Sequence, residues 1–148
     1  MYQKIFQQHA KLLKALSNSK RLEIMQLLRG QSLSVSEMVK MLGLPQANLS
    51  QHLMVLRQFK VVETKRRGKE IYYHIKHKNF TKAADLVREV LFERLGKKIT
   101  RAAEQLTVVV DPVCRMRLTP ASAATSLVRD GKNYFFCGSG CRNLFHKT

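Results

Sequence analysis

Apolar side chains recur every three or four residues through the first 56 positions, a spacing that predicts four short amphipathic helices. Polar or glycine-containing breaks at residues 17–19, at Gly30 and at Gly43 separate these helices. Ser34 or Ser36 is the expected cap of the third helix, and Pro45 suits the first position of the fourth. The first 56 residues are therefore expected to form a small, all-helical unit.

The hydrophobic period changes after residue 60. Residues 61–64 and 70–75 are rich in β-prone side chains, and a basic stretch at 65–69 lies between them, so we expect a hairpin with a basic tip. Residues 80–106 return to helical spacing over about 27 positions, with Gly96 as a weak point. A helix this long cannot bury its apolar face within so small a domain, which favours dimerisation.

The pattern becomes β-like again beyond Asp111-Pro112. Two apolar segments at 126–129 and 132–136 flank Asp130-Gly131, a strong hairpin signal. Residues 138–147 suit one short helix, with Leu144 and Phe145 expected to face inward. We therefore expect a mainly α fold with small β elements: a winged helix-turn-helix domain with a long dimerisation helix over residues 1–106, and a small α+β cysteine-containing domain over 107–148.

The outer face of the fourth helix is polar but uncharged, with side chains that both donate and accept hydrogen bonds. Asparagine and glutamine can bind adenine through two hydrogen bonds, each such pair contributing ~1–3 kcal/mol of discrimination. A short helix pair followed by a basic hairpin is the winged helix-turn-helix arrangement. The candidate DNA-binding residues are Gln46, Asn48, Ser50, Gln51, His52, Arg57, Lys65, Arg66, Arg67 and Lys69.

The charge balance supports a nucleic-acid partner. The chain has 27 Lys and Arg against 10 Asp and Glu, a net charge of +17, and residues 1–78 alone hold 15 basic and 4 acidic side chains. Basic side chains strengthen DNA binding by releasing counterions from the phosphates. A membrane surface fits less well, because the chain lacks an apolar run of ~20 residues, a signal-peptide core and a basic amphipathic anchor. We expect a cytoplasmic protein.

Residues 14–75 resemble the ArsR-type winged-helix repressors. The matching segments are 14–24 (KALSNSKRLEI), 44–57 (LPQANLSQHLMVLR) and 67–73 (RGKEIYY). The resemblance implies a homodimer, built from the first and last helices, that binds double-stranded operator DNA and regulates a metal export or detoxification operon. Many members sense metals through two cysteines on the third helix, but Ser34 and Ser36 stand at those positions here. A second family site uses histidine on the last helix, and residues 80–106 contain none.

All three cysteines of the chain lie in its last 35 residues, as Cys114, Cys137 and Cys141. Thiolates at this spacing suit a thiophilic metal ion, Cu(I), Ag(I) or Zn(II), rather than a hard cation. Met116 and His146 are candidates for a further ligand, although a core position for Met116 and a solvated one for His146 are the simpler expectations. In a reducing compartment such cysteines are ligands or reactive thiols more often than disulfides.

Residues 108–145 resemble the YHS/TRASH class of small metal-binding modules through 110–116 (VDPVCRM) and 130–145 (DGKNYFFCGSGCRNLF). One departure is Arg115, where this class usually has glycine. The sequence contains no catalytic triad, paired carboxylates or phosphate-binding loop, so we do not expect an enzyme. The favoured function is a dimeric repressor that releases DNA on binding metal. A thiol redox or sulfur-species sensor, a metal-trafficking module and a purely structural zinc site stay open as alternatives.

Overall fold

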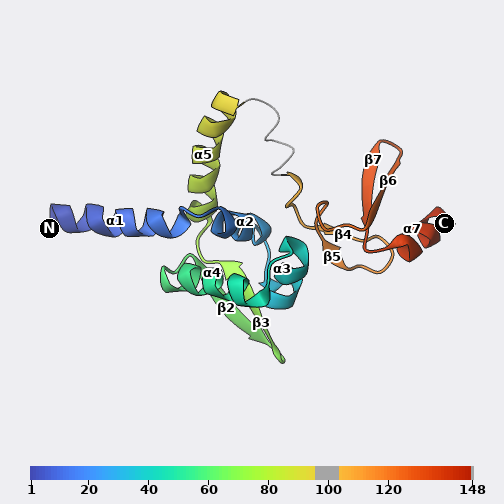
Figure 1. Ribbon diagram of the computed structural model, residues 1–148, viewed down its shortest axis with the longest axis horizontal. Helices are drawn as coiled ribbons and strands as arrows, with labels where there is room; N and C mark the ends of the chain where they lie inside the picture. The colour runs from blue at the N-terminus through green and yellow to red at the C-terminus, as the bar shows by residue number, and fades with distance from the viewer. Residues whose placement is uncertain (96–103, 148) are drawn as a thin grey trace.

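A computed structural model describes residues 1–95 and 104–147 (Figure 1). Residues 1–95 contain five helices and a three-stranded sheet. In chain order these are α1 (Tyr2–Leu16), α2 (Ser19–Leu27), β1 (Leu33–Ser34), α3 (Val35–Leu42), α4 (Gln46–Gln58), β2 (Val62–Arg67), β3 (Glu70–Ile75) and α5 (Lys78–Leu95). The C-terminal part contains β4 (Val109–Val110), β5 (Arg117–Leu118), β6 (Thr125–Arg129), β7 (Lys132–Phe136) and α7 (Ser139–His146).

Local capping signals set the ends of the short helices. The Asn18 side chain accepts a hydrogen bond from the Arg21 backbone N–H and begins α2. Ser34, rather than Ser36, caps α3, and Gly43 ends it with φ of 62°, a left-handed conformation that glycine adopts without strain. Pro45 is the N-cap of α4, one residue before the first helical position at which we expected it. These ends fix the turn between α3 and α4.

The hydrophobic core lies among α2, α3 and α4 and the base of the sheet. Leu49, Leu53 and Leu56 occupy one face of α4 and are buried, as their spacing predicts. They pack with a group of equally buried side chains: Ile24, Met25, Leu27, Leu28, Leu33, Met38, Met41, Val61 and Val62. Burial of this face leaves the opposite face of α4 in solvent.

The sheet has the strand order β1-β3-β2, with both pairs antiparallel. The β2–β3 hairpin is confirmed, but its basic residues are not confined to the tip. Lys65, Arg66 and Arg67 belong to β2, paired with Tyr72, Ile71 and Glu70, so only Gly68 and Lys69 form the turn. Regular pairing to the end of the hairpin produces a longer and stiffer wing than the composition indicated.

The last long helix differs from its prediction. Helix α5 runs over Lys78–Leu95, and the predicted continuation through 96–103 lies outside the described residues. Gln105 and Leu106 are in a turn rather than a helix, and Leu106 and Val108 pack against the hydrophobic core. Burial of these two side chains against the first part of the chain outweighs the helical periodicity that the sequence showed there.

The C-terminal module is built around the β6–β7 hairpin. Asp130 and Gly131 both have positive φ, 52° and 72°, as a two-residue turn of the Asp-Gly type requires. Helix α7 is confirmed, but Leu144 is 56% exposed and does not face inward. Phe145 faces inward as expected, with its ring centroid 4.8 Å from that of Tyr134 and 5.4 Å from that of Phe136. The eight-residue helix α7 therefore packs on the β6–β7 hairpin through an aromatic cluster of Tyr134, Phe136 and Phe145.

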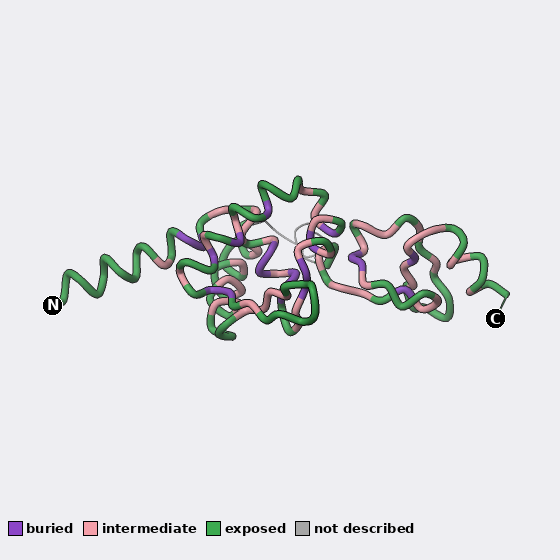
Figure 2. The backbone as a smooth tube through the Cα atoms, turned by 90° about the horizontal axis from the view of Figure 1, so that it is seen from below, coloured by how far each residue is buried: buried purple, intermediate pink, exposed green. Residues whose placement is uncertain are grey.

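Helices α1 and α5 extend away from the core, and most of α1 is exposed (Figures 1 and 2). Each carries large apolar side chains in solvent: Tyr2, Ile5, Phe6 and Leu13 on α1, and Leu86, Val87, Val90 and Leu91 on α5. Among the described residues, helices long and apolar enough to cross a membrane are absent.

Candidate metal centre and nucleic-acid interface

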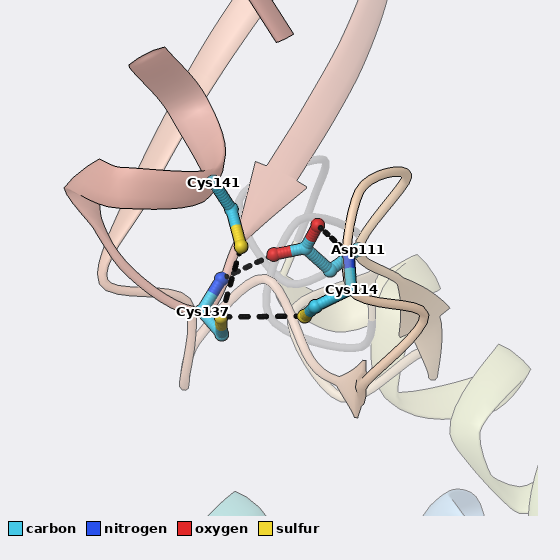
Figure 3. A group of neighbouring side chains, drawn as sticks. All are labelled: Asp111, Cys114, Cys137 and Cys141. Atoms are coloured by element: carbon cyan, nitrogen blue, oxygen red, sulfur yellow. Dashed lines mark hydrogen bonds between the residues drawn. The ribbon is translucent and has the colours of Figure 1, made fainter. Parts of the chain in front are cut away.

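The three cysteine side chains converge on one point although two of them are 23 positions apart (Figure 3). Cys114 lies in the loop between β4 and β5, Cys137 directly follows β7, and Cys141 lies in the first turn of α7. The sulfur of Cys137 is 3.5 Å from that of Cys114 and 3.6 Å from that of Cys141. The β6–β7 hairpin therefore brings the second part of the site back to the first.

Asp111 is the fourth member of this cluster and is completely buried. One carboxylate oxygen accepts the backbone N–H groups of Val113 (2.8 Å) and Cys114 (3.3 Å), and the other accepts that of Cys137 (2.8 Å). Burial alone would raise the pKa of Asp111, but these hydrogen bonds outweigh it and lower the pKa to about 2. The carboxylate thus ties the two cysteine-bearing segments together at the backbone.

The arrangement fits a thiophilic ion. Sulfurs bound at ~2.3 Å around a tetrahedral zinc lie about 3.8 Å from one another, close to the 3.5 and 3.6 Å found here. The ligand atoms of all four residues lie within 4.8 Å of one another. Since both oxygens of Asp111 already accept backbone hydrogen bonds, we assign this residue to positioning the thiols, with the three sulfurs as the principal donors.

Cys137 and Cys141 hold their thiol protons more firmly than an isolated cysteine does, because the pKa of each is raised. Hydrogen bonding to Cys114 and Cys141, together with the Asp111 carboxylate, raises the pKa of Cys137 to about 12. Burial raises the pKa of Cys141 as well. A metal ion binding here must therefore displace protons, which makes its affinity depend on pH. Raised pKa values also disfavour nucleophilic attack, which requires the thiolate.

The two further ligand candidates occupy different settings. Met116 is 48% exposed, so the expectation of a core position for it was wrong; its backbone carbonyl accepts the Asp111 N–H, and this pairing turns its side chain outward. Met116 lines a cleft with Cys114 and Cys137. His146 lies in the last turn of α7 and is exposed. Of the two candidates, Met116 is the one that shares a cleft with the thiols.

The candidate DNA-binding residues lie on α4 and the wing. Gln46, Asn48, Ser50, Gln51 and Arg57 are exposed on α4, and His52 is half-buried. Lys65, Arg66, Arg67 and Lys69 are exposed on the hairpin. Arg66 Nε donates to the Gly68 carbonyl (3.2 Å), and the Arg67 guanidinium lies 5.1 Å from the centroid of the Tyr72 ring. Both contacts orient wing cations without neutralising them.

Two features of the site were not predicted from the sequence. Asp111 precedes Pro112 and lies three positions before Cys114, a spacing typical of an aspartate that accepts backbone N–H groups of a turn, and this signal was available. The second is an ion pair between Glu37 and Arg117, whose side chains approach to 2.8 Å from 80 positions apart. Tertiary packing alone creates that contact, so local patterns contain no sign of it.

Comparison with known proteins agrees with this organisation. Residues 18–64 match the family described as "Bacterial regulatory protein, arsR family", and residues 109–148 match the YHS domain. The chain is 42% identical over 67 residues to the transcriptional repressor PagR of Bacillus anthracis, covering 45% of this chain and 67% of PagR. It is 42% identical over 62 residues to the transcriptional activator HlyU of Vibrio cholerae, covering 42% and 57% respectively.

A solved structure extends the likeness to three dimensions. The homodimeric winged helix-turn-helix DNA-binding domain Mb0332 of Mycobacterium bovis superposes with a TM-score of 0.58 at 30% identity, covering 63% of this chain and 86% of that one. These relatives are winged-helix transcriptional regulators rather than enzymes. The chain therefore belongs to the ArsR family of bacterial regulatory proteins and carries a YHS domain at its C-terminal end.

Proposed function

We propose that this protein is a dimeric transcriptional repressor that binds operator DNA and releases it when a thiophilic metal ion binds at Cys114, Cys137 and Cys141. The observation that carries the proposal is the convergence of three thiols, with sulfur distances of 3.5 and 3.6 Å, in a chain whose other part is a winged helix. We assign DNA binding and dimerisation to residues 1–106 and metal binding to residues 107–148.

The DNA-binding role rests on exposure and charge. The polar face of α4 is free to enter a major groove, with Gln46, Asn48 and Gln51 as the residues that read bases. In this proposal Arg57 and the wing cations contact phosphates, which position the protein without reading sequence. The repressor PagR and the homodimeric Mb0332 domain are relatives of this chain, which supports repression and dimerisation here.

Cu(I), Ag(I) and Zn(II) are the ions that the donor set favours, because three sulfurs form a soft ligand set. When bound, the ion would supply a charged centre that fixes the relative positions of the two cysteine-bearing segments. The serines at positions 34 and 36 cannot supply a second soft site, because hydroxyl oxygens are hard ligands. The Ser34 hydroxyl is also buried and hydrogen-bonded with Glu37 and Ser36.

A structural zinc site is the second candidate, and the small core of the C-terminal module favours it. Asp111, Leu118, Thr119 and Phe136 are its buried side chains among the described residues. Domains of ~40 residues usually need a metal or disulfide to stay folded. The redox alternative is weaker, because the raised pKa values of Cys137 and Cys141 disfavour reactive thiolates.

Fluorescence anisotropy separates these functions. The reduced full-length chain first selects a duplex from a random DNA pool, and its affinity for that duplex is then measured during titration with Cu(I), Ag(I), Zn(II) or a disulfide-forming oxidant. We expect one of the metals to weaken DNA binding by about 5- to 150-fold. Cys137→Ser should abolish this response while keeping the affinity for DNA measured before metal addition.

Each other outcome points to one alternative. Zinc that copurifies at one equivalent per chain, with DNA affinity independent of added metal, would establish the structural site. A response to the oxidant alone would establish redox sensing. An unchanged metal response in Cys137→Ser would refute the ligand assignment.

A further inference from the structure

An ion pair with two-pronged geometry links the C-terminal module to the winged helix. Arg117 of β5 donates to Glu37 of α3 through Nε (3.1 Å to one oxygen) and through its terminal nitrogen (2.8 and 2.9 Å to the two oxygens). About two thirds of each side chain is shielded from solvent. Figure 1 shows α3 on the side of the winged helix that faces the C-terminal module. Such forked pairs fix orientation as well as distance.

On the winged-helix side, Glu37 is part of the start of α3. Its carboxylate accepts the backbone N–H of Ser34 (2.9 Å), and the Ser34 hydroxyl accepts the N–H of Glu37, so the two form a capping box. Ser34 also belongs to β1 and pairs with Tyr72 in the wing strand β3. Glu37 therefore lies where the first helix of the helix-turn-helix meets the base of the wing.

On the metal side, Arg117 follows the loop that holds Cys114. That loop is closed by hydrogen bonds from the Asp111 N–H to the Met116 carbonyl (2.9 Å) and from the Arg115 N–H to the Asp111 carbonyl (3.0 Å). Arg117 then pairs with Val110 across β4 and β5. Because the loop is short and closed at its base, a displacement of Cys114 moves the strand that carries Arg117.

The space between the two parts is a cleft of about 490 Å³. Glu37, Lys40 and Met41 line it from α3, and Cys114, Arg117 and Cys137 line it from the C-terminal module. Two of the three thiols, those of Cys114 and Cys137, thus border the same opening as the ion pair. Burial alone would raise the pKa of Glu37, but its hydrogen bonds to Ser34 and Arg117 lower it, so the carboxylate stays charged at neutral pH.

We propose that the Arg117–Glu37 ion pair transmits occupancy of the cysteine site to the DNA-reading helix. Gathering the three sulfurs around an ion sets the position of the 111–116 loop and hence of Arg117, and Arg117 sets the start of α3 through Glu37. Helix α3 packs on α4, and Met38 and Leu49 of these two helices belong to the same hydrophobic core. The inference rests on the proposed metal response and names the contact on which that response depends.

The test compares Arg117→Gln with Arg129→Gln in the full-length chain. Both variants remove one positive charge from the C-terminal module, but Arg129 is exposed on β6, where its guanidinium lies 5.6 Å from the centroid of the Phe145 ring. The measured quantity is the coupling factor, the ratio of DNA dissociation constants with and without the effective metal. We expect Arg117→Gln to reduce this factor by about 2- to 30-fold and Arg129→Gln to leave it unchanged.

Two further readouts distinguish transmission from simple loss of structure. Metal affinity without DNA, measured by chelator competition, should be the same in Arg117→Gln and the wild type, because the ligands are intact. Metal addition should alter hydrogen exchange at the first amides of α3 in the wild type and leave them unaltered in Arg117→Gln. Arg117→Lys, which keeps the charge but loses the forked geometry, should give an intermediate coupling factor.

Glu37→Gln tests the other partner, since glutamine preserves the capping box but removes the charge. It should lower the coupling factor as much as Arg117→Gln, and the double variant should lower it no further. If Arg117→Gln kept the same coupling factor as the wild type, this inference would be overturned and the proposed function would stand. A wild type whose DNA affinity ignores every metal would overturn the proposed function and this inference together.

Discussion

Asp111 connects the two halves of the cysteine site at the level of single hydrogen bonds. Its carboxylate accepts the N–H groups of Val113, Cys114 and Cys137, which come from two segments far apart in the sequence. A buried carboxylate costs free energy unless its lone pairs are used, and here both oxygens accept hydrogen bonds. Asp111 therefore assembles the site, and the sulfurs supply its chemistry.

Arg115 is the residue at which the cysteine loop is strained. Its φ is 65°, in the left-handed region, where a side chain with a Cβ costs about 1–2 kcal/mol. Its class of modules usually has glycine here, and the backbone conformation explains that preference. The exposed arginine also borders the cleft beside Cys114 and Cys137, so the chain keeps a cation near the thiols at the expense of local strain.

Replacing Arg115 with glycine should therefore stabilise the module. We expect Arg115→Gly to raise the free energy of opening of β6 and β7 by about 1 kcal/mol relative to Arg115→Ala, which removes the same charge but keeps the Cβ. Backbone-amide hydrogen exchange of the full-length chain reads this module separately from the winged helix. Equal protection in the two variants would show that the loop carries no strain at this position.

The wing is the element whose geometry most changes the expected DNA contact. Because Lys65, Arg66 and Arg67 lie in a paired strand, they alternate between faces of the hairpin rather than forming a flexible basic tip. Strand pairing holds each cation at a fixed distance from the helix-turn-helix. The wing should therefore contact phosphates at defined positions along the duplex.

Salt dependence measures this contact directly. If Arg67 neutralises one phosphate, Arg67→Gln should reduce the slope of log affinity against log salt concentration by about 0.9. Affinity should fall for selected and unrelated duplexes alike, since phosphate contacts carry no sequence information. Arg129→Gln, at the end of the other hairpin, is the control with equal loss of charge. A slope unchanged in Arg67→Gln would remove this residue from the interface.

Elements specified by neighbouring residues were predictable from the sequence, and those specified by distant contacts were not. The buried face of α4 and the Asp130-Gly131 hairpin follow from spacing and turn chemistry within a few positions. Leu106 kept a helical spacing but packs on the core in a turn, and Leu144 is exposed because Phe145 fills the aromatic cluster. The three cysteines could be predicted as a site from their side-chain chemistry, whereas the Glu37–Arg117 ion pair could be recognised only in the folded structure.

At the scale of the whole molecule, the exposed apolar faces of α1 and α5 indicate an interface with another chain. Leu86, Val87, Val90 and Leu91 recur at helical spacing on α5 and remain in solvent in the single chain. Exposed apolar patches of this kind usually mark an interface. Since Mb0332 is homodimeric, a second copy of this chain is the expected occupant.

Charges on the α5 face should disrupt the dimer. We expect Val87→Glu with Val90→Glu to give a monomer in sedimentation equilibrium and to weaken DNA binding strongly, because one subunit would read only one half-site. Lys82→Glu changes the net charge by the same amount at an exposed position of α5 and should stay dimeric. A double variant that sediments as the wild type does would place the dimer interface elsewhere.

In the proposed mechanism, metal and DNA oppose each other's binding to one chain. Linkage requires that a metal which weakens DNA affinity by some factor is itself bound more weakly, by the same factor, when the operator duplex is present. The direct measurement is chelator competition for Cu(I), Ag(I) or Zn(II) with and without saturating selected duplex. We expect the duplex to weaken the affinity for the effective metal by about 5- to 150-fold. If the affinity for each of the three metals were the same with and without DNA, the proposed opposition between metal and DNA would be contradicted.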